Sequence, residues 1–283
     1  LIELIKLFFA NKNYLVFAFQ ANLYCSIICK FFGIKIIIRS NSSPSGWKLG
    51  LLKHFVYKKL LKIPKRIIVN SNEFKREYKK KFNLNVRCIY NPLNKSQIIK
   101  LSNFKVNNFF SKNFKDLKII FIGRLVDQKD PMTFLNALKI LKKKILFRSI
   151  IIGKGVYFQE VKKFIDKEEL KKDVRIIKWQ SNPYKYMKYS DLLVSTSKFE
   201  GLPNTLLEAL CLKKFVISTN CPTGPKEILS NGRGGILFNV GNYKDLAKKI
   251  IFFSNNKRRL MSKINFAYKN LRRFDMKKNL NLY

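Results

Sequence analysis

The most informative stretch of this 283-residue chain is STSKFEGLPNTLLEAL, residues 195–210. The apolar run before it predicts a buried strand, and the helical period at its end predicts a helix that begins at Pro203 or Asn204, because proline suits a first turn and asparagine a cap. The loop between them carries Glu200 and Gly201. Such a loop presents backbone N–H groups at the carboxyl edge of a parallel sheet, where anionic ligands bind. The stretch therefore predicts a phosphate-binding loop.

Two carboxylates belong to this stretch. Glu208 falls within the first two turns of the predicted helix, where an acceptor-only carboxylate can hold a vicinal diol such as a ribose. Glu200 precedes the helix and can reach another part of the same ligand. A solvated surface position is the alternative for both residues, and the glycine and the helix start beside them favour a binding site.

Along the chain, short β-branched or aromatic runs alternate with helical segments, a pattern typical of parallel βαβ units. The first series predicts strands at 14–19, 35–39, 66–70 and 86–90, with helices near 21–32, 48–62 and 72–81. The second predicts strands at 117–122, 148–152, 174–177, 192–195, 215–218 and 235–238, with helices near 131–144, 156–169, 183–188, 204–212, 224–230 and 243–254. The polar stretch 91–116 is interpreted as the junction.

These patterns predict an α/β protein with an N-terminal domain and linker at 1–116, a second domain at 117–256 and a basic helical segment at 257–283. Six strands make a complete doubly wound domain. Only four strands fall in the first part, and the chain opens on Leu1 in what resembles the middle of a helix. We therefore expect the N-terminal domain to be incomplete.

The net charge is +41, from 58 Lys and Arg against 17 Asp and Glu. An excess of this size is typical of proteins that bind nucleic acid or an anionic membrane surface. Compositional drift toward lysine is the alternative. Residues 1–116 carry 23 basic and 4 acidic side chains, and residues 117–283 carry 35 and 13. This spread along the chain is what drift predicts, although the first part is almost free of acids.

Cysteine and histidine usage excludes several kinds of site. The five cysteines include no CxxC pair, which implies neither a disulfide framework nor a zinc site and suits a reducing cytosol. The only histidine, His54, is expected to be a solvated or half-buried helix residue. The uncharged run 13–29 is better explained by a strand and a buried helix than by a membrane span.

The sequence resembles a known family. Glu200-Gly-Leu-Pro, a second glutamate eight residues later and a Phe-Val-Ile-Ser strand are similar to the EX7E segment of retaining glycosyltransferases of family 4, which have the GT-B fold. Further matching segments are Gly123-Arg124-Leu125 with Lys129-Asp130, the glycine turn at 153–155, Gly224-Pro225 with Glu227-Ile228, and Arg273-Phe274. The first 90 residues match more loosely.

The resemblance implies a GT-B architecture, in which two Rossmann-like doubly wound domains face each other across a cleft. The N-terminal one, incomplete here, would receive the acceptor. The other would bind a nucleotide sugar, with a UDP-sugar as the expected donor. Arg124 and Lys129 would grip its diphosphate, Glu200 would bind the donor sugar as the third catalytic residue, and Glu208 would bind the ribose. The full expected donor site comprises Gly123, Arg124, Lys129, Glu200, Gly201, Leu202, Pro203, Asn204, Thr205 and Glu208.

The same resemblance implies a metal-independent hexosyltransferase that needs no cofactor besides its donor. The sequence shows no carboxylate cluster for Mg²⁺. Many relatives carry a histidine at the end of an N-terminal strand, where this chain has Arg39-Ser40-Asn41. These three residues are the acceptor-side candidates, and Arg39 could contact an acceptor phosphate or pair with a structural acid.

We therefore expect a retaining enzyme that moves a sugar, such as an N-acetylhexosamine, to a lipid-linked or polysaccharide acceptor in bacterial surface-glycan biosynthesis. It would work in the cytoplasm on the inner face of the plasma membrane, attached peripherally, with no nucleic acid as partner. The alternatives are a GT-B epimerase or other nucleotide-sugar enzyme, a basic nucleic-acid-binding protein and an inactive remnant. A single histidine counts against the epimerase, and no recognition motif supports the second.

Overall fold

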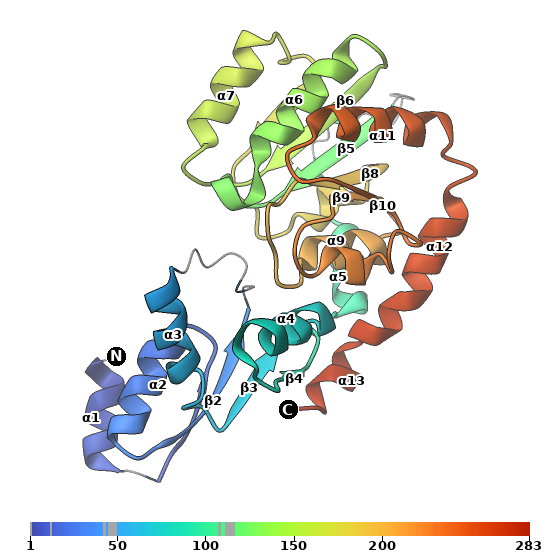
Figure 1. Cartoon of the computed structure of the whole chain (residues 1–283). Coiled ribbons are helices and arrows are strands. Elements are labelled where there is room, and N and C mark those ends of the chain that lie inside the picture. Colours follow the sequence, from blue (N-terminus) through green and yellow to red (C-terminus); the bar gives the residue numbers. More distant parts are fainter. Residues whose placement is uncertain (1, 12, 42–43, 45–49, 107–108, 111–116) are drawn as a thin grey trace. The chain divides into compact units, whose positions relative to one another are not determined.

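The predicted strands form two separate parallel sheets (Figure 1). The structure is a computed structural model that describes residues 2–11, 13–41, 44, 50–106, 109–110 and 117–283. It divides into one unit of Leu1–Tyr90 with Leu282–Tyr283, and a second unit of Asn91–Asn281.

The first unit is built on a four-stranded sheet in the order β1-β2-β3-β4. Its strands are β1 (Leu15–Ala18), β2 (Lys35–Ser40), β3 (Arg66–Val69) and β4 (Arg87–Cys88). Its helices are α1 (Ile2–Ala10), α2 (Asn22–Phe31), α3 (Leu51–Leu60) and α4 (Asn72–Phe82). Phe74, Tyr78 and Phe82 recur at helical spacing on α4 and are fully buried against the sheet. The run 13–29 thus contains a strand and a helix, as predicted, but the helix is not buried: on α2 only Ser26 and Cys29 are buried, and Tyr24 is exposed.

The second unit has a six-stranded sheet in the order β10-β9-β8-β5-β6-β7. Its strands are β5 (Leu117–Ile122), β6 (Phe147–Ile152), β7 (Val174–Ile177), β8 (Leu192–Ser195), β9 (Phe215–Thr219) and β10 (Ile236–Phe238). This is the Rossmann order, in which the chain reverses direction across the sheet between its first strand, β5, and its fourth, β8. Every residue of β8 and β9 is buried, because helices cover both faces of the sheet.

The helices of the second unit divide between the two faces. On one face α6 (Pro131–Lys142), α7 (Phe158–Lys167) and α11 (Tyr243–Asn255) bury their apolar sides in the main core (Figure 1). On the other, α9 (Asn204–Cys211) packs on β8 and β9. The remaining elements are α8 (Tyr184–Met187), α10 (Pro225–Ile228), α12 (Met261–Asn270), α13 (Met276–Leu280) and two short 3₁₀ turns, η2 (Asp127–Lys129) and η3 (Leu271–Phe274).

One helix was not predicted. The polar stretch interpreted as a junction contains α5 (Lys95–Ser102), which packs against α8 and α9 of the second unit. Asn94 caps it, because its side-chain oxygen accepts the N–H of Gln97. Only Ile98 and Ser102 are buried, so the helix has too narrow an apolar stripe to be recognised from its sequence pattern.

Candidate functional site

The predicted site residues lie at the point where the strand order of the second sheet reverses. Strands β5 and β8 are neighbours, with Ile119 beside Leu192 and Ile120 beside Leu193. The turn 123–130 leaves the carboxyl end of β5, and the loop 196–203 leaves the carboxyl end of β8. This crevice is where open parallel sheets bind ligands. The structure also confirms the predicted strand, loop and helix, since β8 ends at Ser195 and α9 begins at Asn204.

The turn after β5 is fixed by the glycine turn after β6. The N–H of Gly123 donates to the carbonyl of Ile152 (3.0 Å), and the N–H of Leu125 donates to that of Lys154 (2.9 Å). A Cβ atom on Gly153 would lie 2.0 Å from the carbonyl oxygen of Gly123. Glycine is therefore needed at position 153, because the backbones of the two turns are in direct contact.

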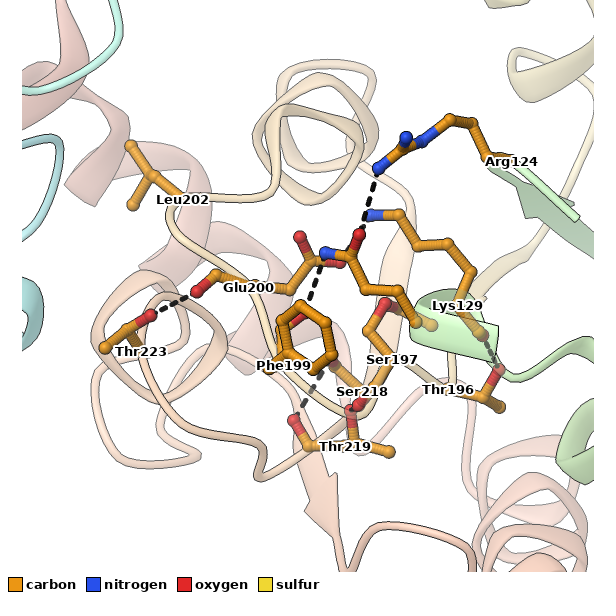
Figure 2. A network of polar contacts seen from close by, with 12 residues as sticks. Arg124, Lys129, Thr196, Ser197, Phe199, Glu200, Leu202, Ser218, Thr219 and Thr223 are labelled. Carbon is orange, nitrogen blue, oxygen red and sulfur yellow. Dashed lines mark hydrogen bonds and ion pairs between the residues drawn. The ribbon is translucent and has the colours of Figure 1, made fainter. Parts of the chain in front are cut away.

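Lys129 and Glu200 join the two loops through an ion pair (Figure 2). Their side chains are 19% and 7% exposed, so the pair is largely buried. The hydroxyl of Thr196 also donates to the carbonyls of Lys129 and Asp130, both at 2.8 Å. The predicted loop glutamate is thus held against the predicted diphosphate-binding lysine.

Arg124 is tied to the same loop through a neutral side chain. Its guanidinium donates to Gln128 Oε1 (2.9 Å), and Gln128 Nε2 donates to the carbonyl of Phe199 (3.0 Å; Figure 2). Arg124 is exposed, and within the described part of the chain no carboxylate forms an ion pair with it. Its positive charge is therefore uncompensated beside a pair that is already neutralised.

The backbone of Glu200 is anchored from the other side. The hydroxyl of Thr223 donates to the carbonyl of Glu200 (2.5 Å), and the N–H of Glu200 donates to the carbonyl of Pro222 (3.3 Å). Gly224 has φ +91°, and a Cβ there would lie 2.6 Å from Pro203 Cδ and 2.7 Å from the carbonyl oxygen of Gly201. The loop 200–203 is thus packed on a turn that only glycine can form.

Glu208 does not join this network. Its carboxylate accepts a hydrogen bond from the hydroxyl of Tyr184 (3.3 Å) and lines a separate cavity of about 300 Å³. This cavity is bounded by α5, α8 and α9, and its lining includes Asn204 but none of Arg124, Lys129 and Glu200. Burial raises the pKa of Glu208, and the hydrogen bond from Tyr184 opposes that shift.

Asn204 is held by a contact that the sequence did not suggest. Asn91 Nδ2 donates to Asn204 Oδ1 (2.7 Å) and, more weakly, to the carbonyl of Leu202 (3.4 Å). The first N–H groups of a helix have no partner within it. In α9 the N–H of Leu206 already donates to the carbonyl of Pro203 (3.2 Å), which leaves those of Asn204 and Thr205 as the donors at the helix start. The predicted phosphate-facing loop is therefore positioned by Asn91, which follows β4.

Sequence reasoning missed four polar residues that build the site. Gln128 and Thr196 link the two loops, Thr223 holds Glu200, and Tyr184 holds Glu208. Their sequence positions gave no signal, because each acts through contacts between residues more than twenty positions apart.

The acceptor-side candidates are divided between two environments in the first unit. Ser40 and Asn41 line a cavity at the carboxyl ends of β1 and β2, whereas Arg39 does not line it. Arg39 is 4% exposed, donates to the carbonyl of Ile89 (3.4 Å) and lies over the ring of Tyr283. His54 is half-buried and stacks on Phe82, as expected of a helix histidine.

The described residues contain neither a candidate metal cluster nor a membrane-spanning helix. No cluster of three or more His, Cys, Asp or Glu side chains in the described ranges is arranged to hold a metal ion. Within those ranges, no helix combines the length and the apolar character needed to cross a membrane.

Sequence comparison finds relatives that are named as glycosyltransferases. An uncharacterized glycosyltransferase of Methanocaldococcus jannaschii is 34% identical over 204 residues, covering 69% of this chain and 50% of the relative. The N-acetylgalactosamine-N,N'-diacetylbacillosaminyl-diphospho-undecaprenol 4-alpha-N-acetylgalactosaminyltransferase of Campylobacter jejuni is 26% identical over 229 residues, covering 77% of this chain and 60% of the relative. The chain thus spans between half and three fifths of these two curated relatives.

Structure comparison gives the same fold. HepE of Anabaena, solved in complex with UDP, superposes with a TM-score of 0.81 at 18% identity, covering 99% of this chain and 80% of that one. The model of the family described as glycosyl transferases group 1 matches residues 104–270, more than half of the chain. Together with the two Rossmann-like units, this match places the chain in the glycosyl transferases group 1 family, with the GT-B fold.

Proposed function

We propose that this protein transfers a hexose from a nucleotide diphosphate sugar to a lipid-linked or saccharide acceptor in surface-glycan biosynthesis. One observation carries the proposal. Arg124, Lys129 and Glu200 come from two loops that are distant in sequence, and one network of polar contacts connects them at the strand-reversal point of the second sheet. Cations gathered there suit a ligand with two phosphate groups.

The chemistry follows from where charge develops. As the sugar–phosphate bond breaks, negative charge grows on the leaving diphosphate, and fixed cations at that place lower the barrier. Arg124 would provide a planar fork and Lys129 a point charge, so the two side chains can bind two phosphate groups. We propose that this pair does the work without a metal ion.

Glu200 would fix Lys129 through their ion pair and accept hydrogen bonds from donor-sugar hydroxyls. Gly201–Thr205 would contribute N–H groups to the phosphates, with Gly123 allowing close approach. Glu208, beside its cavity at α9, would accept hydrogen bonds from the ribose hydroxyls. These roles extend the family 4 resemblance residue by residue.

We further propose that the reaction retains the anomeric configuration. The acceptor oxygen would attack C1 on the face from which the diphosphate leaves, the C1–O bond would break, and the acceptor proton would pass to a phosphate oxygen of the leaving group. The Lys129–Glu200 pair supports this route, because the loop carboxylate is engaged with a lysine and is not set up as a nucleophile.

The proposed acceptor side lies in the first unit, around Ser40 and Asn41. The name of the Campylobacter relative gives a diphospho-undecaprenol-linked sugar as its acceptor and N-acetylgalactosaminyl as the group that it transfers. HepE was solved with UDP. We therefore propose a UDP-sugar donor, such as a UDP-N-acetylhexosamine, and an acceptor on the cytoplasmic side of a membrane.

We propose that the first unit attaches peripherally to an anionic membrane surface. Helices α1 and α3 carry exposed apolar side chains next to lysines; these side chains are Ile2, Leu7, Phe9, Leu52, Phe55 and Val56. Exposed apolar groups flanked by lysine suit an interface that is apolar below and negatively charged above. Sedimentation with phosphatidylglycerol-containing vesicles, weakened by salt and by Leu52→Ser with Phe55→Ser, is expected. Equal binding to neutral phosphatidylcholine vesicles would contradict an electrostatic contribution.

The donor proposal is tested by thermal shift of the whole chain against UDP, GDP, ADP and their sugars. A ligand at 100 times its Kd adds about 2.7 kcal/mol to the free energy of unfolding. We expect uridine nucleotides to stabilise the protein and Arg124→Ala to reduce the shift. Product NMR with the responding donor then gives the anomeric configuration. Absence of a response to every nucleotide would refute the proposal.

A further inference from the structure

A cavity in the first unit lies outside the donor site. It has a volume of about 440 Å³, within the usual range of ligand pockets, about 300–1,000 Å³. It is formed by the β1–α2 turn, the end of β2, and side chains from α3 and α4. We call it the aromatic pocket; its lining is Phe19, Gln20, Ala21, Asn22, Leu23, Tyr24, Ile38, Ser40, Asn41, Tyr57, Leu61 and Tyr78.

Among the residues that the structure describes, none of those that line the aromatic pocket carries a charge. Charged residues make up 27% of the chain, and the net charge is +41, so an uncharged lining is unusual here. Arg39 lies between two lining residues, Ile38 and Ser40, but does not line the pocket itself, because successive strand residues face opposite sides of a sheet. Its guanidinium donates to the carbonyl of Ile89 and to Asn41 Oδ1, so the neutral Asn41 side chain stands between this charge and the pocket.

The lining combines aromatic faces with neutral hydrogen-bonding groups. Phe19 and Tyr24 are 55% and 66% exposed, so their rings are available to a ligand. Gln20 and Asn41 add exposed amides, which both donate and accept hydrogen bonds. A sugar ring has matching chemistry, with an apolar C–H face for an aromatic ring and a rim of hydroxyls for the amides.

A phosphate group suits this lining less well. The α2 N-terminus borders the pocket, but its dipole provides only about half an elementary charge. A phosphate dianion placed among aromatic rings and amides would lose hydration without meeting a cation, which is costly. The same site with Arg39 turned inward would favour a phosphate, and the observed arrangement does not provide that charge.

We infer that the aromatic pocket holds an uncharged sugar ring of the acceptor, stacked on Tyr24 or Phe19 with its hydroxyls on Gln20 and Asn41. This inference rests on the proposed function, because it assigns the chemistry of the acceptor in that reaction. It separates this protein from enzymes whose acceptor is recognised through a phosphate group.

The test is saturation-transfer NMR on the full chain with four defined probes. Two are neutral, methyl α-D-galactopyranoside and methyl N-acetyl-α-D-glucosaminide, and two are phosphorylated, D-ribitol 5-phosphate and glycerol 3-phosphate. Tyr24→Ala removes an exposed ring of the pocket. Phe31→Ala is the matched control, since Phe31 lies two turns further along α2, is 83% exposed and lines no part of the pocket.

We expect at least one neutral glycoside to bind, Tyr24→Ala to weaken it about tenfold and Phe31→Ala to leave it unchanged. Asn41→Lys is expected to lower the affinity for the glycoside, because it removes an amide, and to allow the phosphorylated probes to bind, because it adds a cation. Two results would overturn the inference: binding of a phosphorylated probe that depends on Tyr24, or an unchanged affinity for the glycoside in Tyr24→Ala.

The thermal shift with UDP, run on the same samples, separates the two failures. A UDP response without Tyr24-dependent glycoside binding overturns the inference and leaves the proposed function in place. Tyr24-dependent glycoside binding without any nucleotide response supports a sugar site and refutes the transferase proposal.

Discussion

The ion pair between Lys129 and Glu200 makes a quantitative prediction. Lys129→Met would leave the Glu200 carboxylate, 7% exposed, without its partner. Removing one partner of a buried pair costs about 3–5 kcal/mol, and the 19% exposure of Lys129 places this case near the lower end, at about 3 kcal/mol. Glu200→Gln leaves the better-hydrated lysine unpaired and should cost about 1–2 kcal/mol.

The double variant contains no unpaired buried charge, so it should lose only about 1–2 kcal/mol. The coupling free energy of the cycle is then about 2–4 kcal/mol. The pair of Asp245 and Lys249 is the matched control, because it is an (i, i+4) pair on α11 with side chains 33% and 30% exposed. Its coupling in Asp245→Asn and Lys249→Met should not exceed about 0.5 kcal/mol.

The assay is urea unfolding followed by tryptophan fluorescence. The chain has two tryptophans, so in a Trp47→Phe background Trp179 reports the unit that contains the pair. Trp47 itself lies outside the described residues. In thermal unfolding, Lys129→Met should lower Tm by about 6–12 °C, since each kcal/mol shifts a domain of 150–250 residues by about 2–4 °C. Additive single and double variants would show that Lys129 does not hold Glu200 and would remove the basis of the proposed donor site.

Three further outcomes are expected. Arg124→Ala should weaken UDP binding by about 10- to 100-fold and leave Tm unchanged, since Arg124 is exposed and its guanidinium is hydrogen-bonded to a neutral amide. Arg259 is also exposed, and Arg259→Ala is the control that should leave UDP binding unchanged. Isothermal titration calorimetry measures both affinities. Burial raises the pKa of Glu208 above its value in the unfolded chain. At pH values between these two pKa values the folded state binds more protons than the unfolded state, so the free energy of unfolding falls as the pH rises through this range. Glu208→Gln should therefore stabilise at pH 7.5 but not at acidic pH while it weakens nucleotide binding, and identical Tm differences at both pH values would contradict this. Gly224→Ala should cost more than Gly232→Ala, because both residues have positive φ but only the first would place its Cβ against the loop 201–203; equal losses in urea unfolding would show that the loop yields.

The fold was predictable because its signals are local. The β8 strand, the loop with Glu200 and the helix α9 are contiguous in sequence, and apolar period, proline and asparagine mark their ends. The strand order could be expected from the same alternation, since parallel strands joined by helices form doubly wound sheets. Helix α5 was missed because its apolar stripe consists of little more than Ile98, and its stability comes from α8 and α9.

The site was predictable only in part, because its polar contacts connect distant segments. Proximity of Lys129 and Glu200 follows from topology, since both lie at the carboxyl ends of adjacent strands, but their direct pairing does not. The spacing of Glu200 and Glu208 suggests one ligand, whereas the structure gives them different partners, a lysine and the hydroxyl of Tyr184. Their environments also differ, since the first is neutralised by a cation and the second is buried beside a neutral donor. These two carboxylates should differ in their response to a bound phosphate, because only Glu200 has to share its cation with the ligand. Donor binding should therefore weaken the ion pair of Glu200 with Lys129, whereas Glu208 should gain only hydrogen bonds from the ribose hydroxyls.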